Sequence, residues 1–360
     1  MSRTIDVLDA GDPGFEARLR AIAERATAAD GDVEAPVRDI LAEVRQGGDR
    51  ALVEITRRLD RFEVGGRLEI PRRELEAAET RLAAPARRAL RLAARRIREF
   101  HRRQLRKGWR YRDSTGLVLG QKVEPLDRVG VYVPGGRASY PSSVLMNVIP
   151  AKVAGVSEVI AVSPPSPDEG NYGAVLAAAS IAGVDRFFRV GGAQAVAALA
   201  FGTESIPRVD KIVGPGNVYV QTAKRMVFGR VGIDNFAGAS EVLVIADRSA
   251  TAEWVAADLL AQAEHDEMAS AVCVTDAPEL ARAVAAEVDR QLATLPRKDI
   301  AELALKRFGG VFVVESLARA IEIANRIAPE HLELAVERPE KCLGAVKHAG
   351  AVFLGSHVPE

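Results

Sequence analysis

Histidine is scarce in this chain, with five residues among 360, and one of the five stands three positions after an amide side chain. His265 closes an expected helix over 253–264, and Gln262 precedes it by three residues. Positions i and i+3 of a helix share a face, so both side chains could reach one metal ion. Gln is an uncommon zinc ligand, and acidic neighbours are equally typical of a solvated helix end. The pair is a candidate metal site, with an ordinary helix surface as the alternative.

A second histidine directly follows a carboxylate. Glu330 and His331 come after Pro329, between an expected helix over 317–328 and a short apolar run over 332–336. A carboxylate beside an imidazole offers two groups whose pKa values can be tuned apart, as acid–base catalysis requires. An exposed polar loop between a helix and a strand would have the same composition. The histidines without an evident partner are His101, His348 and His357.

Three glycine-rich turns follow expected strands: Pro134-Gly135-Gly136, Gly191-Gly192-Ala193-Gln194 and Gly214-Pro215-Gly216-Asn217. Glycine lets a ligand approach the backbone closely, and a following helix N-terminus can hold a phosphate. None of the three is the G-x-G-x-x-G dinucleotide fingerprint, since Tyr219 occupies the third glycine position of the nearest match. Any strand-to-helix turn can carry glycine, but the amide side chains of two turns favour a nucleotide or another polar ligand.

The elements around these residues change in character along the chain. The first 125 residues have helical patterning, with expected helices over 17–26, 36–45, 50–59, 72–82 and 85–107. Short apolar runs then alternate with Ala-rich helical stretches, which is typical of βαβ units and a parallel sheet. The expected strands are 129–133, 158–162, 186–190 and 211–213, then 241–246, 270–274, 310–314 and 351–354.

This pattern predicts an α/β protein with two successive α/β units, over 129–240 and 241–360. Residues 1–25 form an N-terminal tail or helix. The helical region 26–128 could pack on either unit, and we expect it to pack with the second. Two α/β units and a helical region are a reasonable content for 360 residues.

Composition narrows the classes of partner. Lys plus Arg and Asp plus Glu both number 49, so no polyanionic partner is expected. The Arg-rich run 87–110 has helical apolar spacing and no series of aromatic stacking residues interleaved with its arginines, which favours a solvated helix face over nucleic-acid binding. Two distant cysteines, Cys273 and Cys342, favour a reducing compartment. With no secretory signal and no membrane-spanning stretch evident, we expect a cytoplasmic protein.

Several of these motifs, in this order, resemble those of the histidinol dehydrogenase family. The resemblance rests on 129–136 (VGVYVPGG), 139–146 (SYPSSVLM), 190–195 (VGGAQA), 200–205 (AFGTES), 213–217 (VGPGN), 240–247 (SEVLVIAD), 262–265 (QAEH) and 328–332 (APEHL). It extends from about residue 95 to the C-terminus, and the N-terminal helices agree more loosely. It implies two incomplete Rossmann-like units with parallel sheets, with NAD on the first unit and the zinc and acid–base residues on the second.

The resemblance also implies a role for each matching residue. Tyr132, Gln194 and Asn217 match NAD-contacting positions. Ser240, Gln262, His265 and His331 match substrate-binding positions, and Gln262 and His265 also match zinc ligands. Glu330 and His331 match the acid–base pair. Family members work as homodimers in which C-terminal residues complete the partner's active site.

The implied reaction oxidises L-histidinol to L-histidine, the last step of histidine biosynthesis. One zinc per subunit would hold the substrate, and two NAD molecules would each remove a hydride. His331 would take the alcohol proton, and Glu330 would activate water to hydrate the enzyme-held aldehyde. A closed site is expected because free aldehydes react with amines.

The chain departs from the family pattern in two places. Ala239 stands where proline is usual, which frees a backbone φ angle before Ser240. The family also continues beyond the motif at 355–360 with an Asp zinc ligand, a substrate-contacting Glu and a zinc-binding His. We therefore expect a C-terminally truncated member with two of four zinc ligands, unless His357 supplies another.

Two other functions remain open at this point. A family relative could oxidise another alcohol, such as a sulfonated diol. A non-catalytic homologue could bind NAD or a partner subunit through the same sheets.

Overall fold

The computed structural model describes residues 4–24, 33–65, 67–135, 140–166, 169–235, 238 and 240–358. Gly136, Ser139, Ala239 and Glu360, which the sequence analysis used, lie outside these residues. The chain divides into two compact units, one of Asp30–Phe236 and one of Met1–Ala29 with Ala237–Glu360. Within the described ranges, no helix combines the length and apolar character needed to cross a membrane.

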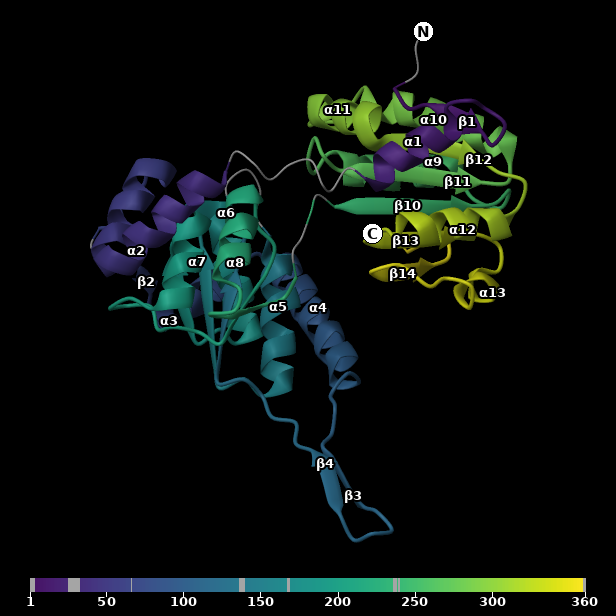
Figure 1. The fold of residues 1–360 in the computed structure, drawn as a ribbon. Helices are drawn as coiled ribbons and strands as arrows, with labels where there is room; N and C mark the ends of the chain where they lie inside the picture. The colour runs from purple at the N-terminus through teal and green to yellow at the C-terminus, as the bar shows by residue number, and fades with distance from the viewer. Residues whose placement is uncertain are drawn as a thin grey trace. The chain divides into compact units, whose positions relative to one another are not determined.

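The unit Asp30–Phe236 is built on a six-stranded sheet of order β2-β7-β6-β5-β8-β9 (Figure 1). All neighbours are parallel except β2, which runs antiparallel to β7. Its strands are β2 (Glu69–Ile70), β5 (Arg128–Tyr132), β6 (Glu158–Ser163), β7 (Arg186–Arg189), β8 (Lys211–Val213) and β9 (Gly232–Ile233). Its helices are α2 (Glu34–Ile55), α3 (Arg72–Arg81), α4 (Ala84–Arg102), α5 (Pro141–Ala154), α6 (Glu169–Ala182), α7 (Gly192–Phe201) and α8 (Val218–Val227).

Side chains alternate between the two faces of this sheet along each strand, and both faces are covered by helices. Val129 and Val131 of β5 face a cluster that includes residues of α3 to α6, whereas Tyr132 faces a cluster with α2, α7 and α8. Helix α2 is kinked at Gly48, whose φ of 53° and ψ of −137° are not helical. The π-helical turn η2 (Thr56–Asp60) follows directly.

The second unit has a six-stranded parallel sheet of order β1-β12-β11-β10-β13-β14. Its strands are β1 (Val7–Asp9), β10 (Glu241–Ala246), β11 (Ser270–Thr275), β12 (Gly309–Val313), β13 (His331–Ala335) and β14 (Ala351–Leu354). Its helices are α1 (Phe15–Ala23), α9 (Ala252–Ala263), α10 (Pro278–Leu292), α11 (Lys298–Phe308), α12 (Leu317–Ile327) and α13 (Pro339–Leu343). Helices α9 to α11 cover one face of the sheet, and α1 and α12 cover the other.

The two sheets share one strand order. In each, five strands in chain order lie as 3-2-1-4-5, which is a Rossmann sheet without its sixth strand. Each sheet gains a sixth strand at its edge from the N-terminal part of the chain, β2 in the first unit and β1 in the second. Two incomplete Rossmann-like units are therefore confirmed.

The expected packing of the helical region on the second unit is wrong. Helices α2, α3 and α4 contact α7, α6 and α5, all within the first unit. The physical reason is local, because β2 pairs with β7 and the apolar stripes of α2 and α3 bury against helices beside that strand. The short N-terminal segment, with β1 and α1, joins the second sheet instead.

A hairpin that the sequence analysis did not predict extends from the first unit (Figure 1). It consists of β3 (Trp109–Arg112) and β4 (Val118–Gln121), and every residue of both strands is exposed. Residues 109–112 alternate between aromatic residues and Arg and contain no apolar run of the kind that predicts a buried strand, so the sequence pattern does not predict this hairpin.

Candidate active site

The sequence-predicted nucleotide residues gather at the carboxyl edge of the first sheet. Strands β5 and β8 are neighbours there, and the strand order reverses between them. Tyr132 ends β5, Asn217 lies in the loop after β8, and Gln194 lies in the first turn of α7 after β7. The reversal point of a doubly wound sheet is where such folds bind ligands. All three residues thus lie along the edge that this rule selects.

Tyr132 is buried, with 3% of its surface exposed, and its hydroxyl accepts a hydrogen bond from the backbone N–H of Gly192 at 3.1 Å. Burial raises the pKa of Tyr132 to about 12, the Gly192 hydrogen bond lowers it, and the nearby Asp60 carboxylate adds to the rise. The phenol is therefore neutral at physiological pH and holds the second glycine loop against the end of β5.

Gln194 presents a buried acceptor in the same place. Its side-chain Nε2 donates to Asp60 Oδ2 at 3.3 Å, whereas its Oε1 is buried without a hydrogen-bond partner among the described residues. A Cβ on Gly192 would come within 2.4 Å of that Oε1, so the glycine leaves the amide its space. An unpaired acceptor beside a glycine cradle suits a ligand that donates hydrogen bonds, as nucleotide hydroxyl and amide groups do.

Asp60 is a residue that the sequence analysis missed. It ends the π-helical turn η2, and Arg61 after it has a left-handed φ of 52°. Although Asp60 as a whole is exposed, partial burial of its carboxyl raises its pKa. π-Helical turns and left-handed non-glycine residues are enriched at functional sites, so the backbone itself marks this position.

The third glycine loop is tightly packed before α8. Gly214 has a φ of 111°, and a Cβ there would lie 2.2 Å from the carbonyl oxygen of Tyr132. A Cβ on Gly216 would clash with the side chain of Val220 at 2.4 Å. Asn217 caps α8, because its Oδ1 accepts from the Val220 N–H at 3.2 Å. The residues of this edge therefore fit an NAD molecule by a glycine cradle, a helix N-terminus and a buried unpaired amide oxygen.

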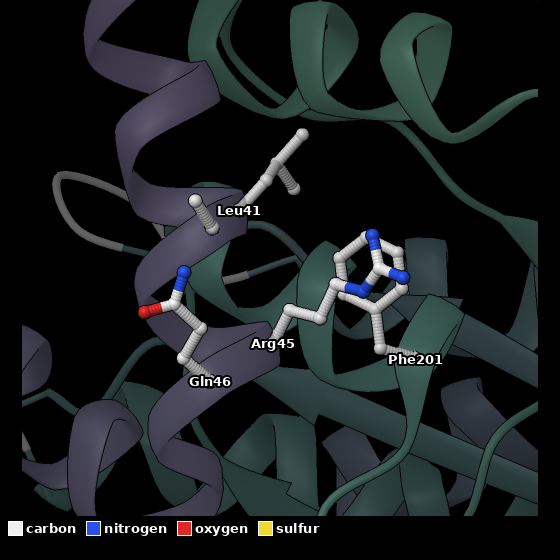
Figure 2. A pocket seen from close by; sticks show the side chains of 5 residues that line it. Leu41, Arg45, Gln46 and Phe201 are labelled. Carbon is white, nitrogen blue, oxygen red and sulfur yellow. The ribbon is translucent and has the colours of Figure 1, made fainter.

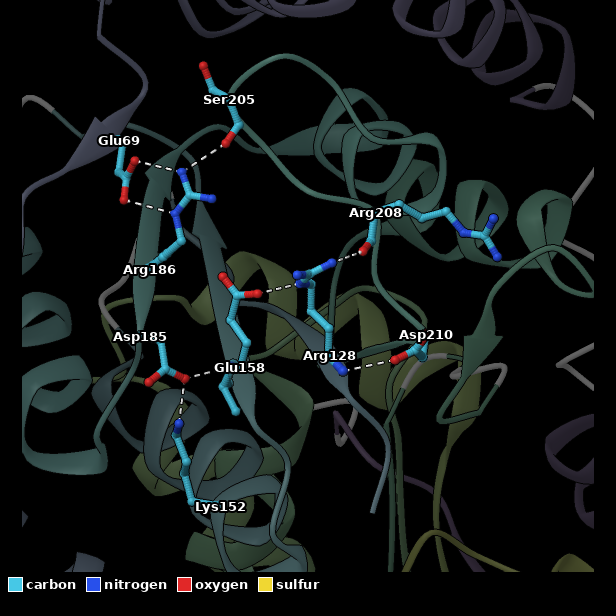
Figure 3. Close-up of polar contacts among 10 residues, drawn as sticks. Glu69, Arg128, Lys152, Glu158, Asp185, Arg186, Ser205, Arg208 and Asp210 are labelled. Atoms are coloured by element: carbon cyan, nitrogen blue, oxygen red, sulfur yellow. Dashed lines mark hydrogen bonds and ion pairs between the residues drawn. The ribbon is translucent and has the colours of Figure 1, made fainter. Parts of the chain in front are cut away.

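The opposite, amino edge of the first sheet is closed by ion pairs (Figure 3). Arg128 pairs with Glu158 and donates to the carbonyl oxygen of Arg208, and Arg186 pairs with Glu69. Lys152 pairs with Asp185 in the same region. These contacts occupy the polar groups of that edge within the unit.

A surface pocket of the first unit lies elsewhere. It measures about 450 Å³ and is lined by Leu41, Ala42, Arg45, Gln46 and Phe201 of α2 and α7, with the Arg45 guanidinium 5.7 Å from the centre of the Phe201 ring (Figure 2). None of the sequence-predicted site residues lines it.

The second group of candidate residues gathers at the amino edge of the other sheet. Ser240 directly precedes β10, and Glu330 directly precedes β13. The loop that follows Gln262 leads into β11. These three strands are neighbours in the order β11-β10-β13. The Ser270 N–H donates to the Ser240 carbonyl at 3.1 Å, and the Glu330 N–H donates to the Glu241 carboxylate at 3.3 Å. The sheet thus brings together residues that are far apart in the sequence.

His331 is placed firmly at this edge. It is half-buried at the start of β13, where it pairs with Val242 on one side and with Ala351 on the other. Its ring meets the Phe353 ring edge-on, with centroids 5.9 Å apart. Strand alternation puts its side chain on the same face as Val242 and Ala335, which pack with α9.

Glu330 lies in a turn whose backbone is held on both sides. Helix α12 ends at Ala328, which has a left-handed φ of 55°. The carbonyl oxygen of Glu330 accepts from the Ala351 N–H at 2.8 Å, and a Cβ on Gly350 would lie 2.6 Å from that oxygen. The side chain itself is exposed. A fixed backbone with an exposed carboxylate suits a group that exchanges protons with water.

Gln262 and His265 do not share a helix face as the spacing predicted. Helix α9 ends at Ala263, so His265 lies beyond it in a turn where its N–H donates to the Gln262 carbonyl at 3.2 Å. Gln262 is 1% exposed, whereas His265 is exposed. Across the parts of the chain that the structure describes, no three His, Cys, Asp or Glu side chains form a group that could hold a metal ion. Two donors are fewer than the three that catalytic zinc takes, so these residues alone do not make a zinc site.

Comparison with known proteins gives one family. The family model described as histidinol dehydrogenase matches residues 23–360. A histidinol dehydrogenase of Pseudomonas syringae pv. tomato is 54% identical over 355 residues, which are 98% of this chain and 79% of that protein. One of Syntrophotalea carbinolica is also 54% identical, over 98% of this chain and 82% of its own length. The crystal structure of histidinol dehydrogenase from Elizabethkingia anophelis matches with a TM-score of 0.93 and 33% identity, covering 100% of this chain and 82% of that chain.

Proposed function

Because this chain belongs to the histidinol dehydrogenase family, whose members are NAD-dependent oxidoreductases, we propose that Glu330 and His331 are its acid–base pair in the oxidation of L-histidinol to L-histidine. One observation carries the proposal. Ser240, Gln262 and the Glu330–His331 pair, distant in sequence, lie next to three neighbouring strands at one edge of one sheet. Substrate-binding and proton-transfer groups must lie within reach of one another, and this edge provides that arrangement.

His331 takes the proton of the substrate hydroxyl. Its imidazole is half-buried, and its backbone is paired on both sides, so the ring has a defined position relative to a bound alcohol. Removing the hydroxyl proton as the C–H hydride departs avoids a protonated carbonyl product and lowers the barrier. Ser240, half-buried at the start of β10, offers a hydroxyl that orients the substrate.

Glu330 acts on the second half of the reaction. Its exposed carboxylate accepts a proton from a water molecule, whose oxygen then adds to the aldehyde carbonyl. The resulting hydrate again carries a hydroxyl and a C–H bond on one carbon. His331 takes the proton of that hydroxyl in the second oxidation, which leaves the carboxylate of histidine.

Tyr132, Gln194 and Asn217 hold the nucleotide. When NAD is bound, its nicotinamide ring accepts the hydride in each oxidation. Gln194 Oε1 is the acceptor for a nucleotide N–H or O–H group, and the first turn of α8, which Asn217 caps, presents N–H donors to phosphate. Tyr132 orients the Gly191–Gly192 loop through its hydroxyl.

The family also uses zinc, for which this chain offers Gln262 and His265. The described residues supply two ligands at this position, so zinc would bind there only with further ligands. The steps assigned above to Glu330 and His331 are proton transfers at their own side chains.

A homodimer is the second part of the proposal. The hairpin of β3 and β4 carries Trp109, Tyr111 and Leu119 on one face, and all three are more than 40% exposed. An isolated two-stranded hairpin is marginally stable in water. A second copy of the chain, which presents the same apolar face, would cover it.

The test is the stoichiometry of NADH with L-histidinol as substrate, with zinc first supplied and then chelated. About two NADH per histidinol, lost on chelation, is the expected result for two successive hydride transfers. Folded protein that binds NAD but forms no NADH from histidinol would overturn the proposed function. About one NADH per histidinol would overturn the role of Glu330, since the aldehyde would then leave before hydration.

A further inference from the structure

Lys224 of α8 is a fully buried cation behind the third glycine loop of the first unit. It is 0% exposed, and no other lysine and no arginine in the described part of the chain is buried. Its Nζ donates to the carbonyl oxygen of Gly214 at 3.0 Å and pairs with the carboxylate of Asp234. Neither Lys224 nor Asp234 belongs to a motif that the sequence analysis singled out.

Asp234 holds the other side of the same glycine. Its Oδ2 accepts from the Gly214 N–H at 2.7 Å, while its Oδ1 accepts from Lys224. The two backbone polar groups of Gly214 are therefore both engaged by one ion pair, in which Lys224 is buried and the Asp234 side chain is 29% exposed. On its remaining side, Gly214 lies against the Tyr132 carbonyl, where a Cβ would come within 2.2 Å. The glycine is fixed from three directions.

A structural role for the pair explains little of this arrangement. Moving the Lys224 ammonium out of water costs much of what its attraction to Asp234 returns, so an apolar pair of similar size would stabilise the fold as well. What an apolar pair lacks is control of the Gly214 peptide. Without the ammonium, the Gly214 carbonyl has no buried donor and can turn toward the ligand edge, where it would repel an anion.

We propose that Lys224 and Asp234 are positioning residues for the dinucleotide. They keep the Gly214 carbonyl turned inward so that the nucleotide's phosphates meet only the N–H groups at the start of α8. That helix end is open to solvent, since Val218 and Tyr219 in its first turn are 41% and 42% exposed. This inference rests on the proposed NAD site and adds two residues that act through the loop and do not touch the ligand.

A matched control exists at the opposite edge of the same sheet. Lys152 pairs with Asp185, whose Oδ2 also accepts a backbone N–H, that of Val159, at 2.6 Å. This pair likewise joins a lysine to an aspartate that accepts a backbone N–H, but it lies at the amino edge of the sheet (Figure 3), and its lysine is half-buried where Lys224 is fully buried. Lys152→Met therefore reports the effect of losing such a pair on the fold alone.

The experiment measures the dissociation constants of NAD, ADP-ribose and adenosine for the full chain by titration calorimetry or ligand-observed NMR, with melting temperatures alongside. We expect Lys224→Met to weaken NAD and ADP-ribose at least tenfold and adenosine less than twofold. Lys152→Met should leave all three within twofold. Asp234→Asn, which keeps the side-chain shape, should weaken NAD severalfold, and it serves as the test if Lys224→Met does not fold.

Three results would overturn the inference. The first is an unchanged NAD affinity in folded Lys224→Met, or in Asp234→Asn if Lys224→Met does not fold. This result would leave the proposed function intact. Another is an equal loss for adenosine, which would mean that the whole pocket loosens. The third is failure of the unaltered chain to bind NAD, which would remove the proposed nucleotide site together with the inference.

Discussion

Glu330 and His331 are adjacent in sequence but occupy different surroundings. His331 is half-buried with its ring against Phe353, whereas the Glu330 side chain is exposed beyond the end of the strand. The difference follows from the turn at Ala328, which ends α12 and delivers the chain into β13 at His331. Two neighbouring groups can thus serve two steps, one on a bound alcohol and one on water.

Replacing these two residues should separate the two oxidations. His331→Asn should lower kcat about 100- to 10,000-fold, the usual contribution of a general base, without changing NAD affinity. Glu330→Gln should still form the first NADH while the second becomes slow in a single-turnover experiment. His101→Asn, at a half-buried histidine of α4 whose Nδ1 lies 2.6 Å from the Gln104 side-chain oxygen, is the control and should leave kcat unchanged. A normal kcat in His331→Asn would contradict its assigned role.

Tyr132 should make the first unit sensitive to alkaline pH. Its pKa is raised to about 12 in the folded chain from an ordinary value of 10, so its contribution to stability is full below pH 10. Between pH 10 and 12 the unfolded chain releases the proton and the folded chain does not, so the free energy of unfolding falls by up to about 1.4 kcal/mol per pH unit. Urea unfolding at pH 8 and pH 11 should show a smaller pH effect in Tyr132→Phe. An identical pH effect in both proteins would argue against a neutral, buried phenol.

At the scale of elements, we expect α8 to depend on its N-cap for both stability and ligand binding. Asn217→Ala removes the acceptor for the Val220 N–H and should lower the free energy of unfolding by about 1 kcal/mol. Ser316 caps α12 in the other unit in the same way, so Ser316→Ala should cost a similar amount. Only Asn217→Ala should weaken NAD binding, as measured by calorimetry. Equal NAD affinities in the two variants would show that the cap of α8 does not serve the nucleotide.

The central strands of both sheets were predictable because they are buried on both faces, whereas the short edge strands β1, β2 and β9 were not predicted. Apolar runs at 129–133 and 158–162 coincide with β5 and β6 within one residue at each end. The two helices expected over 36–45 and 50–59 are one element, α2, kinked at Gly48 and continued by η2. Gly48, between the two expected helices, breaks the helical geometry but does not separate them by a loop.

What sequence could not predict is which distant residues meet. Asp60, Lys224 and Asp234 belong to no motif, and their proximity to the glycine loops follows from strand order and helix packing. The carboxyl-edge rule located the NAD residues but not the second group, which lies at an amino edge. Residue types and the family resemblance singled out the members of this second group, but neither predicted that they meet at that edge. The roles of all these residues remain predictions.

At the scale of the whole molecule, the exposed hairpin is the surface through which we expect the chain to form a dimer. Tyr111 and Leu119 are directly opposite each other on β3 and β4, and Trp109 stacks with Tyr111 at 6.0 Å. Leu119→Asp would place a charge in the proposed interface and should shift the chain from dimer to monomer in sedimentation at micromolar concentration. Leu343→Asp, at an exposed leucine of α13, is the control and should leave the dimer intact. A dimer that persists in Leu119→Asp would place the interface elsewhere.

The edge strand β1 has a consequence for how the protein is made. Val7 pairs with Val311, so β1, which is synthesised long before β12, cannot find its place until β12 has been made. The unit Asp30–Phe236 is contiguous and can complete its sheet during translation. Until β12 and α12 have been made, Leu19 and Ile22 of α1, which are fully buried in the folded protein, lack the residues of these two elements against which they pack. Closure of the second sheet is therefore a late, long-range step of folding, and β1 and α1 stay accessible to chaperones and proteases until β12 has been made.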